Sequence, residues 1–306
     1  MRLREIKQIL EENVDKLKVN NSSDVGGAKY EITNFQDLYV AIRNIEQLAF
    51  IEEDIAHLDK MTSIFHDKSA KVIIDGTGLK NLNEIIKVIK LKVDTVIMAI
   101  DVALPEQNPN SVSIKLPSYT DLSMVSDFIK EIDTILNLTL VDQYKGNVKL
   151  QNFDTGSNWI EIILQNKDAV IFLGAIVGCT IKFMQSSYLQ WKQTEHTINA
   201  LNTNEEAKQL ILKSLGDTVN FQAQSHASAL MKDFNIESSH QEYHTELSYS
   251  IQKLAELMSH GTQIHTALNA PEETKEAFPD AKTALLLIEN ATKLLTDGTT
   301  VDNKES

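Results

Sequence analysis

The C-terminal half of the sequence most constrains the fold, because its apolar residues recur every three or four positions from Asp168 onward. This spacing is typical of amphipathic helices. It predicts helices at about 205–234, about 239–268 and 281–295, after an apolar helix that begins near residue 169. These segments amount to about 130 residues, so we expect a helical bundle or a long helical hairpin.

Strand signals lie between residues 71 and 165. The runs KVIID at 71–75 and SVSIKLP at 111–117 are rich in β-branched residues and end at glycine or proline. The runs NVKLQNF and NWIEIIL flank the string Asp-Thr-Gly-Ser at 154–157. This arrangement predicts a hairpin with glycine at the position that needs a positive φ.

One segment, 82–104, is ambiguous. It is compatible with one long apolar helix, or with a short helix followed by a strand near 95–101, and periodicity does not separate the two. We expect the helix. The sequence as a whole predicts a mostly helical α+β fold, in which a small mixed sheet or hairpin region at about 71–165 precedes the bundle.

Changes in composition divide the chain into four expected regions. They are an N-terminal helical segment at 1–65, a small α+β domain at 66–167, a C-terminal helical bundle at 168–296 and a disordered tail at 297–306. Within the first region, the polar run at 19–34 is expected to be a loop between two helices.

Charge and cysteine content exclude several classes of function. The chain has 29 Lys and Arg against 43 Asp and Glu, a net charge of −14, which disfavours binding to phosphate backbones or anionic lipid. A single cysteine, Cys179, excludes an intrachain disulfide framework and a cysteine-rich zinc site. In apolar surroundings we expect this thiol to be an unreactive packing residue.

The apolar run at 169–181 is the segment that most resembles a membrane span. As a helix it reaches about 20 Å, which is less than the roughly 30 Å of hydrocarbon in a bilayer. We expect a buried core helix in a cytoplasmic protein, and membrane association through 169–184 is a disfavoured alternative.

The string FDTGSNW at 153–159 resembles the active-site motif of pepsin-like aspartic proteases, in which a turn presents a catalytic carboxylate. That chemistry requires two aspartates sharing a proton, and the sequence contains no second Asp-Thr-Gly or Asp-Ser-Gly. The protease family is also almost entirely β, whereas helices follow here. We interpret the string as a hairpin turn.

Two aspartates define an alternative metal site. The string IIDGTG at 73–78 resembles the signature of haloacid-dehalogenase-like phosphatases, but Ile73 occupies the position of their nucleophilic aspartate. If 95–101 forms a strand, Asp75 and Asp101 both lie at strand ends and can hold Mg²⁺ in a metal-dependent hydrolase. The simpler interpretation is a turn aspartate and a helix-surface aspartate.

Two histidines have a spacing that can chelate a metal, since His240 and His244 stand four apart on a predicted helix. The zincin signature requires glutamate directly after the first histidine, and Gln241 is there instead. His260 and His265 are expected further along the same helix, at least about 24 Å from His244. We interpret all four as surface histidines.

Candidate contact residues occur in two places. Gly174 and Gly178 have the spacing that allows close approach of two helices, with Trp159 upstream. A second group has near-heptad spacing on the predicted helix 239–268. Its members are Tyr243, Leu247, Ile251, Leu254 and Met258.

The sequence therefore favours a non-enzymatic interaction or scaffold protein, which self-associates or binds a protein partner through its helical C-terminal half. No cofactor and no direct contact with nucleic acid are expected. The alternatives are the metal-dependent hydrolase and an acidic inhibitor, or decoy, of a DNA-binding protein.

Overall fold

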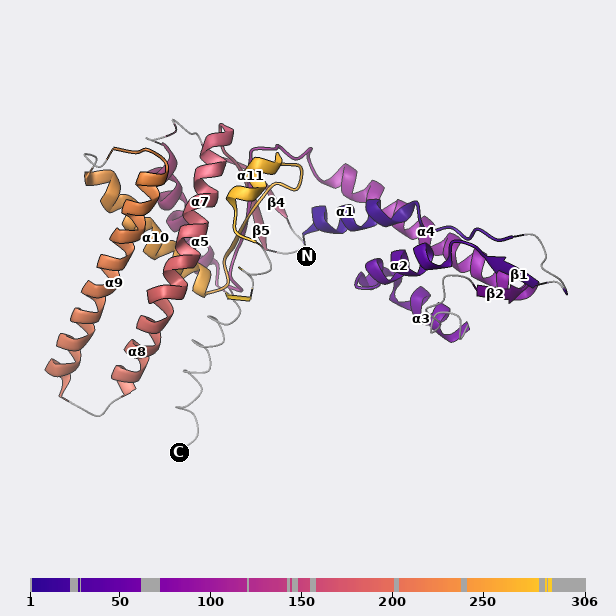
Figure 1. The fold of residues 1–306 in the computed structure, drawn as a ribbon, viewed down its shortest axis with the longest axis horizontal. Helices are drawn as coiled ribbons and strands as arrows, with labels where there is room; N and C mark the ends of the chain where they lie inside the picture. The colour runs from indigo at the N-terminus through magenta and orange to yellow at the C-terminus, as the bar shows by residue number, and fades with distance from the viewer. Residues whose placement is uncertain are drawn as a thin grey trace. The chain divides into compact units, whose positions relative to one another are not determined.

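The structure is a computed structural model that describes residues 2–22, 27, 29–61, 72–119, 121–141, 144, 148–154, 158–200, 204–237, 241–280, 284 and 286–287. It is 70% helical with two small antiparallel sheets, which confirms the predicted mostly helical α+β class. The chain forms two compact units, unit 1 at Met1–Glu106 and unit 2 at Gln107–Ser306. Figure 1 labels their helices and strands.

This division differs from the expected domain boundaries at 65/66 and 167/168. The strand and long helix at 72–103 pack with the N-terminal helices in unit 1. The remaining strands, from residue 111 onward, pack with the C-terminal helices in unit 2. Changes in local composition do not show which helices a strand packs against.

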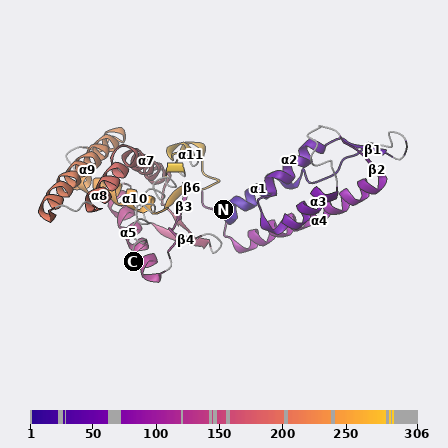
Figure 2. The ribbon, with the colours of Figure 1, turned by 90° about the horizontal axis from the view of Figure 1, so that it is seen from below.

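Unit 1 consists of helices around a two-stranded sheet. Its elements are α1 (Leu3–Val14), β1 (Lys29–Ile32), α2 (Phe35–Ile45), η1 (Ala49–Ile51), α3 (Glu52–Met61), β2 (Val72–Asp75) and α4 (Gly76–Ala103). Helix α4 runs the length of this unit beside α1 and α3, as Figure 2 shows. The ambiguous segment 82–104 is thus continuous helix to residue 103, and no strand forms at 95–101.

The polar run at 19–34 is not entirely a loop, because Lys29–Ile32 forms β1. This strand pairs antiparallel with β2, with Lys29 opposite Asp75 and Ile32 opposite Val72. Ile32 is fully buried in the unit 1 core, whereas the neighbouring polar side chains are partly or fully exposed. A single buried apolar residue in a polar run gives too weak a signal to predict a strand.

Unit 2 combines a four-stranded sheet with long helices. Its elements are β3 (Ser111–Lys115), α5 (Leu122–Leu136), η3 (Asn137–Val141), β4 (Lys149–Asp154), β5 (Trp159–Ile163), α7 (Lys167–Phe183), η4 (Met184–Tyr188), α8 (Leu189–Ala200), α9 (Glu205–Asp233), α10 (Gln241–Ser259), β6 (Gln263–Thr266) and α11 (Glu272–Ala277). The strand order is β4-β5-β3-β6, and all three pairs are antiparallel. The pairing of β4 with β5 confirms the predicted hairpin, whereas its turn residues 155–157, including Gly156, lie outside the described residues.

The sequence suggested helix throughout the C-terminal region, but the structure contains a strand there. Helix α10 ends at Ser259, and β6 then joins the sheet beside β3. Gly261 has φ = 103°, a conformation that glycine adopts readily, and this permits the sharp turn between the two elements. The predicted helix at 281–295 falls mainly outside the described residues.

The core of unit 2 lies between one face of the sheet and helices α5, α7, α9 and α10. The run Lys167–Ala200 is helical throughout, with a π-helical turn at Met184–Tyr188. By length and composition it could cross a membrane, but 61% of its most apolar window is buried inside the protein. Side chains in its N-terminal part, including Phe172 and Ile176, are fully buried, as expected for a core helix.

Candidate functional site

The predicted heptad seam on α10 lies inside the protein. Its five side chains are between 0% and 8% exposed and belong to the core of unit 2. They are Tyr243, Leu247, Ile251, Leu254 and Met258. Their contact surface is already occupied by the chain itself, so a partner cannot reach it without opening unit 2.

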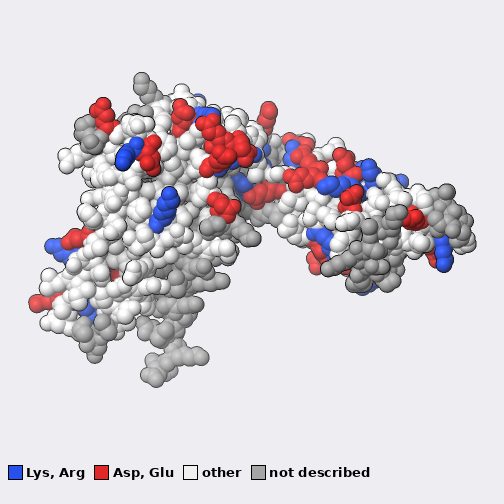
Figure 3. Space-filling model, viewed as in Figure 1, with Lys and Arg blue, Asp and Glu red and all other residues white. Residues whose placement is uncertain are grey.

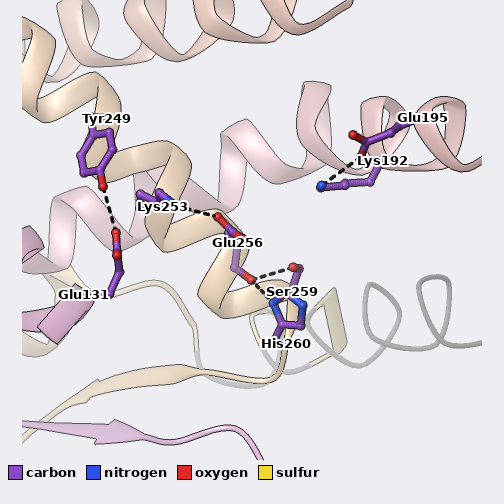
Figure 4. A network of polar contacts seen from close by, with 8 residues as sticks. All are labelled: Glu131, Lys192, Glu195, Tyr249, Lys253, Glu256, Ser259 and His260. Atoms are coloured by element: carbon purple, nitrogen blue, oxygen red, sulfur yellow. Dashed lines mark hydrogen bonds and ion pairs between the residues drawn. The ribbon is translucent and has the colours of Figure 1, made fainter. Parts of the chain in front are cut away.

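The outward side of α10 is polar instead. The Tyr249 hydroxyl donates a hydrogen bond of 3.2 Å to Glu131, and Lys253 pairs with Glu256 at 3.2 Å. The backbone carbonyl of Glu256 also accepts a bond of 2.7 Å from the Ser259 hydroxyl, as Figure 4 shows. Ser259 itself is buried, whereas the exposed contacts of Tyr249 and Lys253 contribute little stability. These contacts lie along the polar side of α10 and do not form a catalytic or metal-binding arrangement.

The two predicted contact glycines have different surroundings. A Cβ at position 174 would lie 2.7 Å from Cδ2 of Phe278 and 2.9 Å from the carbonyl oxygen of Ala277. Position 178 has open space, with nothing within 4 Å. Gly174 is therefore the point where α7 and the end of α11 approach closely, within one chain. Trp159 is buried in β5, and its ring contacts the His265 ring at 5.3 Å between centroids, with the two planes tilted by 49°.

The alternative metal site at Asp75 and Asp101 is contradicted. Because α4 is continuous, the two aspartates lie about 39 Å apart along one helix. Asp75 is the N-cap of α4, where its carboxylate accepts a 2.7 Å hydrogen bond from the Gly78 amide. Asp101 pairs with Lys7 of α1 at 2.5 Å. Among the described residues, no three metal-binding side chains come together.

The histidines do not form a metal site in the part of the chain that the structure describes, and His240 lies outside it. Nε2 of His244 is 2.8 Å from the Ser228 hydroxyl and 3.0 Å from the carbonyl oxygen of Gln224, so it fastens α10 to α9. His265 lies in β6 and not on the helix of His244, because α10 ends before it.

Cys179 is a half-buried residue on α7 that faces α9. Its thiol donates a weak hydrogen bond of 3.6 Å to the carbonyl oxygen of His226. Burial raises the pKa of the thiol to about 11, and the nearby Lys182 only partly offsets this. The thiol is therefore protonated at neutral pH, which agrees with the expected packing role.

The sheet face away from the bundle carries a polar row that the sequence did not single out. Asn152, Glu161, Ser113 and His265 occupy directly paired positions on β4, β5, β3 and β6. Glu161 is only 7% exposed, and its carboxylate accepts hydrogen bonds of 2.9 Å from Gln107 and 3.0 Å from Ser111.

This buried carboxylate has a structural role. Gln107 also accepts a hydrogen bond of 3.2 Å from the amide of Leu268, and its backbone carbonyl accepts one of 2.8 Å from Asn269. Glu161 thus holds two loops, before β3 and after β6, against the sheet. In the sequence WIEII, Glu161 occupies the polar position of an alternating strand, where a side chain usually faces solvent. The local pattern therefore did not indicate that Glu161 is buried.

The most distinctive unoccupied surface in the described residues is on α4. We define the α4 stripe as five residues spaced 3, 4, 3 and 4 apart, namely Val88, Leu91, Thr95, Met98 and Val102. Their apolar members are 45%, 67%, 68% and 90% exposed, in chain order. At about 100° per residue, the stripe lies opposite the buried face of α4. That buried face includes Leu82, Ile86, Ile89, Val93 and Ile100.

Sequence reasoning missed this stripe, although its spacing is visible in the sequence. The segment has apolar residues on nearly every side of the helix. Spacing alone therefore does not distinguish the row that is buried from the row that is exposed. The packing of α1 and α3 against one side of α4 decides which stripe is covered. A depression of about 270 Å³ between α3 and α4 borders the stripe at Val88.

A heptad-spaced apolar row on a straight helix is a surface for another helix. Side chains with this spacing insert between those of a partner helix as knobs into holes. The one polar side chain of the stripe, Thr95, donates its hydroxyl to the Leu91 carbonyl oxygen at 2.7 Å, so the stripe presents an apolar surface suited to burial against another chain. It spans about 21 Å along the helix axis.

Comparison with known proteins places the chain in a family. No family model matches the sequence, and no solved structure matches it. The sequence is 31% identical over 290 residues to the uncharacterized protein YqaP of Bacillus subtilis strain 168. The match covers 92% of this chain and 93% of YqaP. Because it extends over nearly the whole of both chains, this protein belongs to the same family as YqaP.

Proposed function

We propose that the protein is a non-enzymatic interaction protein that binds another protein chain through the α4 stripe. The observation that carries this proposal is the exposure of Val88, Leu91, Met98 and Val102 in one heptad-spaced row. Soluble proteins rarely leave a contiguous apolar row on the surface unless a partner covers it. The row replaces the α10 seam, which the core of unit 2 already occupies, as the contact surface.

The expected affinity follows from the size of the stripe. Full burial of an aliphatic side chain contributes about 1.5–3 kcal/mol. The loss of translational and rotational freedom on association costs about 4–15 kcal/mol. The four side chains are only 45–90% exposed before binding, so burying them on both partners contributes about as much as that cost. The proposal is therefore a reversible contact that forms at sufficient concentration.

The charge distribution does not favour the acidic decoy of a DNA-binding protein. On the face drawn in Figure 3, acidic and basic side chains are interspersed over unit 1. Some acids of unit 1 are paired with bases of the same unit, as in Lys92–Asp54 at 2.6 Å and Arg43–Asp59 at 2.9 Å. A surface that imitates a nucleic acid requires a continuous field of one sign.

Site-specific photo-cross-linking in cells tests the proposal. A benzoyl-phenylalanine would replace Met98 in the full chain, and a matched control would carry it at Leu122 of α5. Leu122 is 83% exposed and Met98 is 68% exposed, so both probes face solvent without a partner. We expect a discrete cross-linked protein adduct at position 98 and none at position 122.

The adduct identifies the partner by mass spectrometry, whether it is another protein or a second copy of the chain. Either identity supports the proposed function. Absence of any adduct at position 98, in cells where both proteins accumulate as soluble chains, would overturn it. Equal adduct formation at positions 98 and 122 would also overturn it, since the contact would then not be specific to the stripe.

A further inference from the structure

We infer that the partner of the α4 stripe is a second copy of this chain, bound with its α4 helix antiparallel. This inference rests on the proposed function and adds the identity and direction of the partner. It is carried by the order of charges along one edge of the stripe. That edge reads Lys80, Lys87, Asp94 and Asp101, each seven residues from the next.

Residues seven apart lie on one line along a helix that pairs with another helix. The edge of α4 is therefore basic at its N-terminal end and acidic at its C-terminal end. In an antiparallel pair with two-fold symmetry, the same edge of both helices lies side by side in reversed direction. The basic end of each copy then meets the acidic end of the other.

A parallel pair lacks this complementarity. There, each edge faces the opposite edge of the partner, five residues further along the chain. Lys87 would face Lys92 of the other copy, twice, and Asp94 would face Ala99. Like charges at such positions are destabilising. The charges along α4 thus favour the antiparallel orientation of the two helices, in addition to the apolar contact between them.

Apolar burial selects the register of the antiparallel pair. When Val88 lies opposite Met98 of the other copy, Leu91 lies opposite Thr95. Val88, Leu91 and Met98 are then covered, whereas Val102 faces Glu84. A shift by one heptad, about two turns, puts Val88 opposite Leu91 and Met98 against the polar Asn81. Burying an aliphatic side chain stabilises a contact more than an exposed ion pair does. The first register is therefore favoured.

In this register, Lys87 faces Asp101 of the other copy at both ends of the interface. Asp101 keeps its own ion pair with Lys7, but its side chain is 50% exposed and has room for a second cation. Asp94 meets Asp94 of the other copy near the two-fold axis, which is a like-charge contact. On the other edge, Lys92 meets Lys92 of the other copy, a second like-charge contact, which is weakened because each lysine is paired with Asp54 of its own chain at 2.6 Å.

The first test is the association state of the purified full chain by sedimentation velocity over about 5–500 µM. We expect a reversible dimer that Leu91→Asp abolishes and that Leu122→Asp, the matched exposed control, leaves intact. Asp94→Asn is expected to tighten the dimer several-fold by removing the like-charge contact. Circular dichroism of each variant verifies that the helices remain folded.

Disulfide trapping tests direction. In a Cys179→Ser background, Val88→Cys and Met98→Cys variants are oxidised separately and as a mixture. The antiparallel register places position 88 beside position 98 of the other copy, but about 15 Å from its own equivalent. A disulfide requires Cα atoms within about 7 Å. We expect a disulfide-linked dimer only in the mixture.

Each contrary result has a distinct meaning. Disulfides in the separate variants, with none between them in the mixture, would establish a parallel pair and overturn the inferred direction. A monomer at every concentration would overturn the second copy as partner. In that case the proposed function still stands if position 98 forms a photo-adduct with a different protein. If it forms no adduct, both the proposed function and the inferred dimer are overturned.

Discussion

The hydroxyl group of Tyr243 in α10 donates a hydrogen bond of 2.9 Å to the backbone carbonyl of Thr139 in the π-helical turn η3. The two residues are 104 positions apart, and both are buried. Burial also raises the pKa of the Tyr243 phenol. This bond joins the start of α10 to η3, which directly follows α5.

Removing this hydroxyl tests its contribution. Tyr243→Phe leaves the Thr139 carbonyl buried without that donor, so we expect the free energy of unfolding to fall by about 1–2 kcal/mol in urea titrations. Tyr249→Phe is the matched control, because its hydroxyl bonds Glu131 on an exposed surface. The control should change stability by less than about 0.5 kcal/mol. Equal losses in the free energy of unfolding for the two variants would show that the buried hydrogen bond stabilises the fold no more than the exposed one.

The two glycines of α7 should respond to alanine in opposite directions. Gly174→Ala forces its new methyl against the Ala277 backbone, so the free energy of unfolding should fall by about 1–3 kcal/mol. Gly178→Ala meets open space and improves helix propensity, which should raise stability by about 0.5–1 kcal/mol. Thermal and urea unfolding of both variants decide the matter. A stabilising Gly174→Ala would contradict the close approach of α7 to α11.

Alanine substitutions in the α10 seam and in the α4 stripe should change the free energy of unfolding of the monomer by different amounts. Leu254 is fully buried, so Leu254→Ala should lower the free energy of unfolding by about 2–5 kcal/mol. Leu91 is 67% exposed, so Leu91→Ala should change it by less than about 0.5 kcal/mol. Urea unfolding at low protein concentration separates this effect from assembly. A large loss in the Leu91 variant would mean that the stripe is part of the core.

Cys179 should be far less reactive in the folded protein than in the unfolded chain. Its pKa is raised from 9.0 to about 11 by burial, so the thiolate fraction near pH 8 is about 100-fold lower when folded. Reaction with an aromatic disulfide reagent, followed by absorbance with and without denaturant, measures this ratio. Similar rates in the two conditions would contradict the raised pKa.

The same shift determines a pH dependence of stability. The folded state favours the neutral thiol, so its contribution is complete below about pH 9 and is lost as the pH rises toward 11. Cys179→Ala should remove this part of the alkaline loss of stability. The variant serves as its own control below pH 8, where its curve should run parallel to that of the wild-type chain.

Several elements were predictable because their signals are local. The alternation in WIEII and the turn residues before it predicted the β4–β5 hairpin, and the 3–4 spacing predicted α9. The helix at 239–268 was predicted too long, because the residues of β6 fit either structure. Its strand pairing depends on β3, about 150 residues earlier in the chain.

The candidate surface shows the same division between local and distant causes. By itself, the sequence determined that residues 88–102 and 243–258 each carry apolar side chains at helical spacing, because spacing is a property of neighbouring residues. Only the tertiary structure decided that the 243–258 row is buried and that the α4 stripe is exposed. Burial depends on which elements pack against each face, and those elements come from distant parts of the chain.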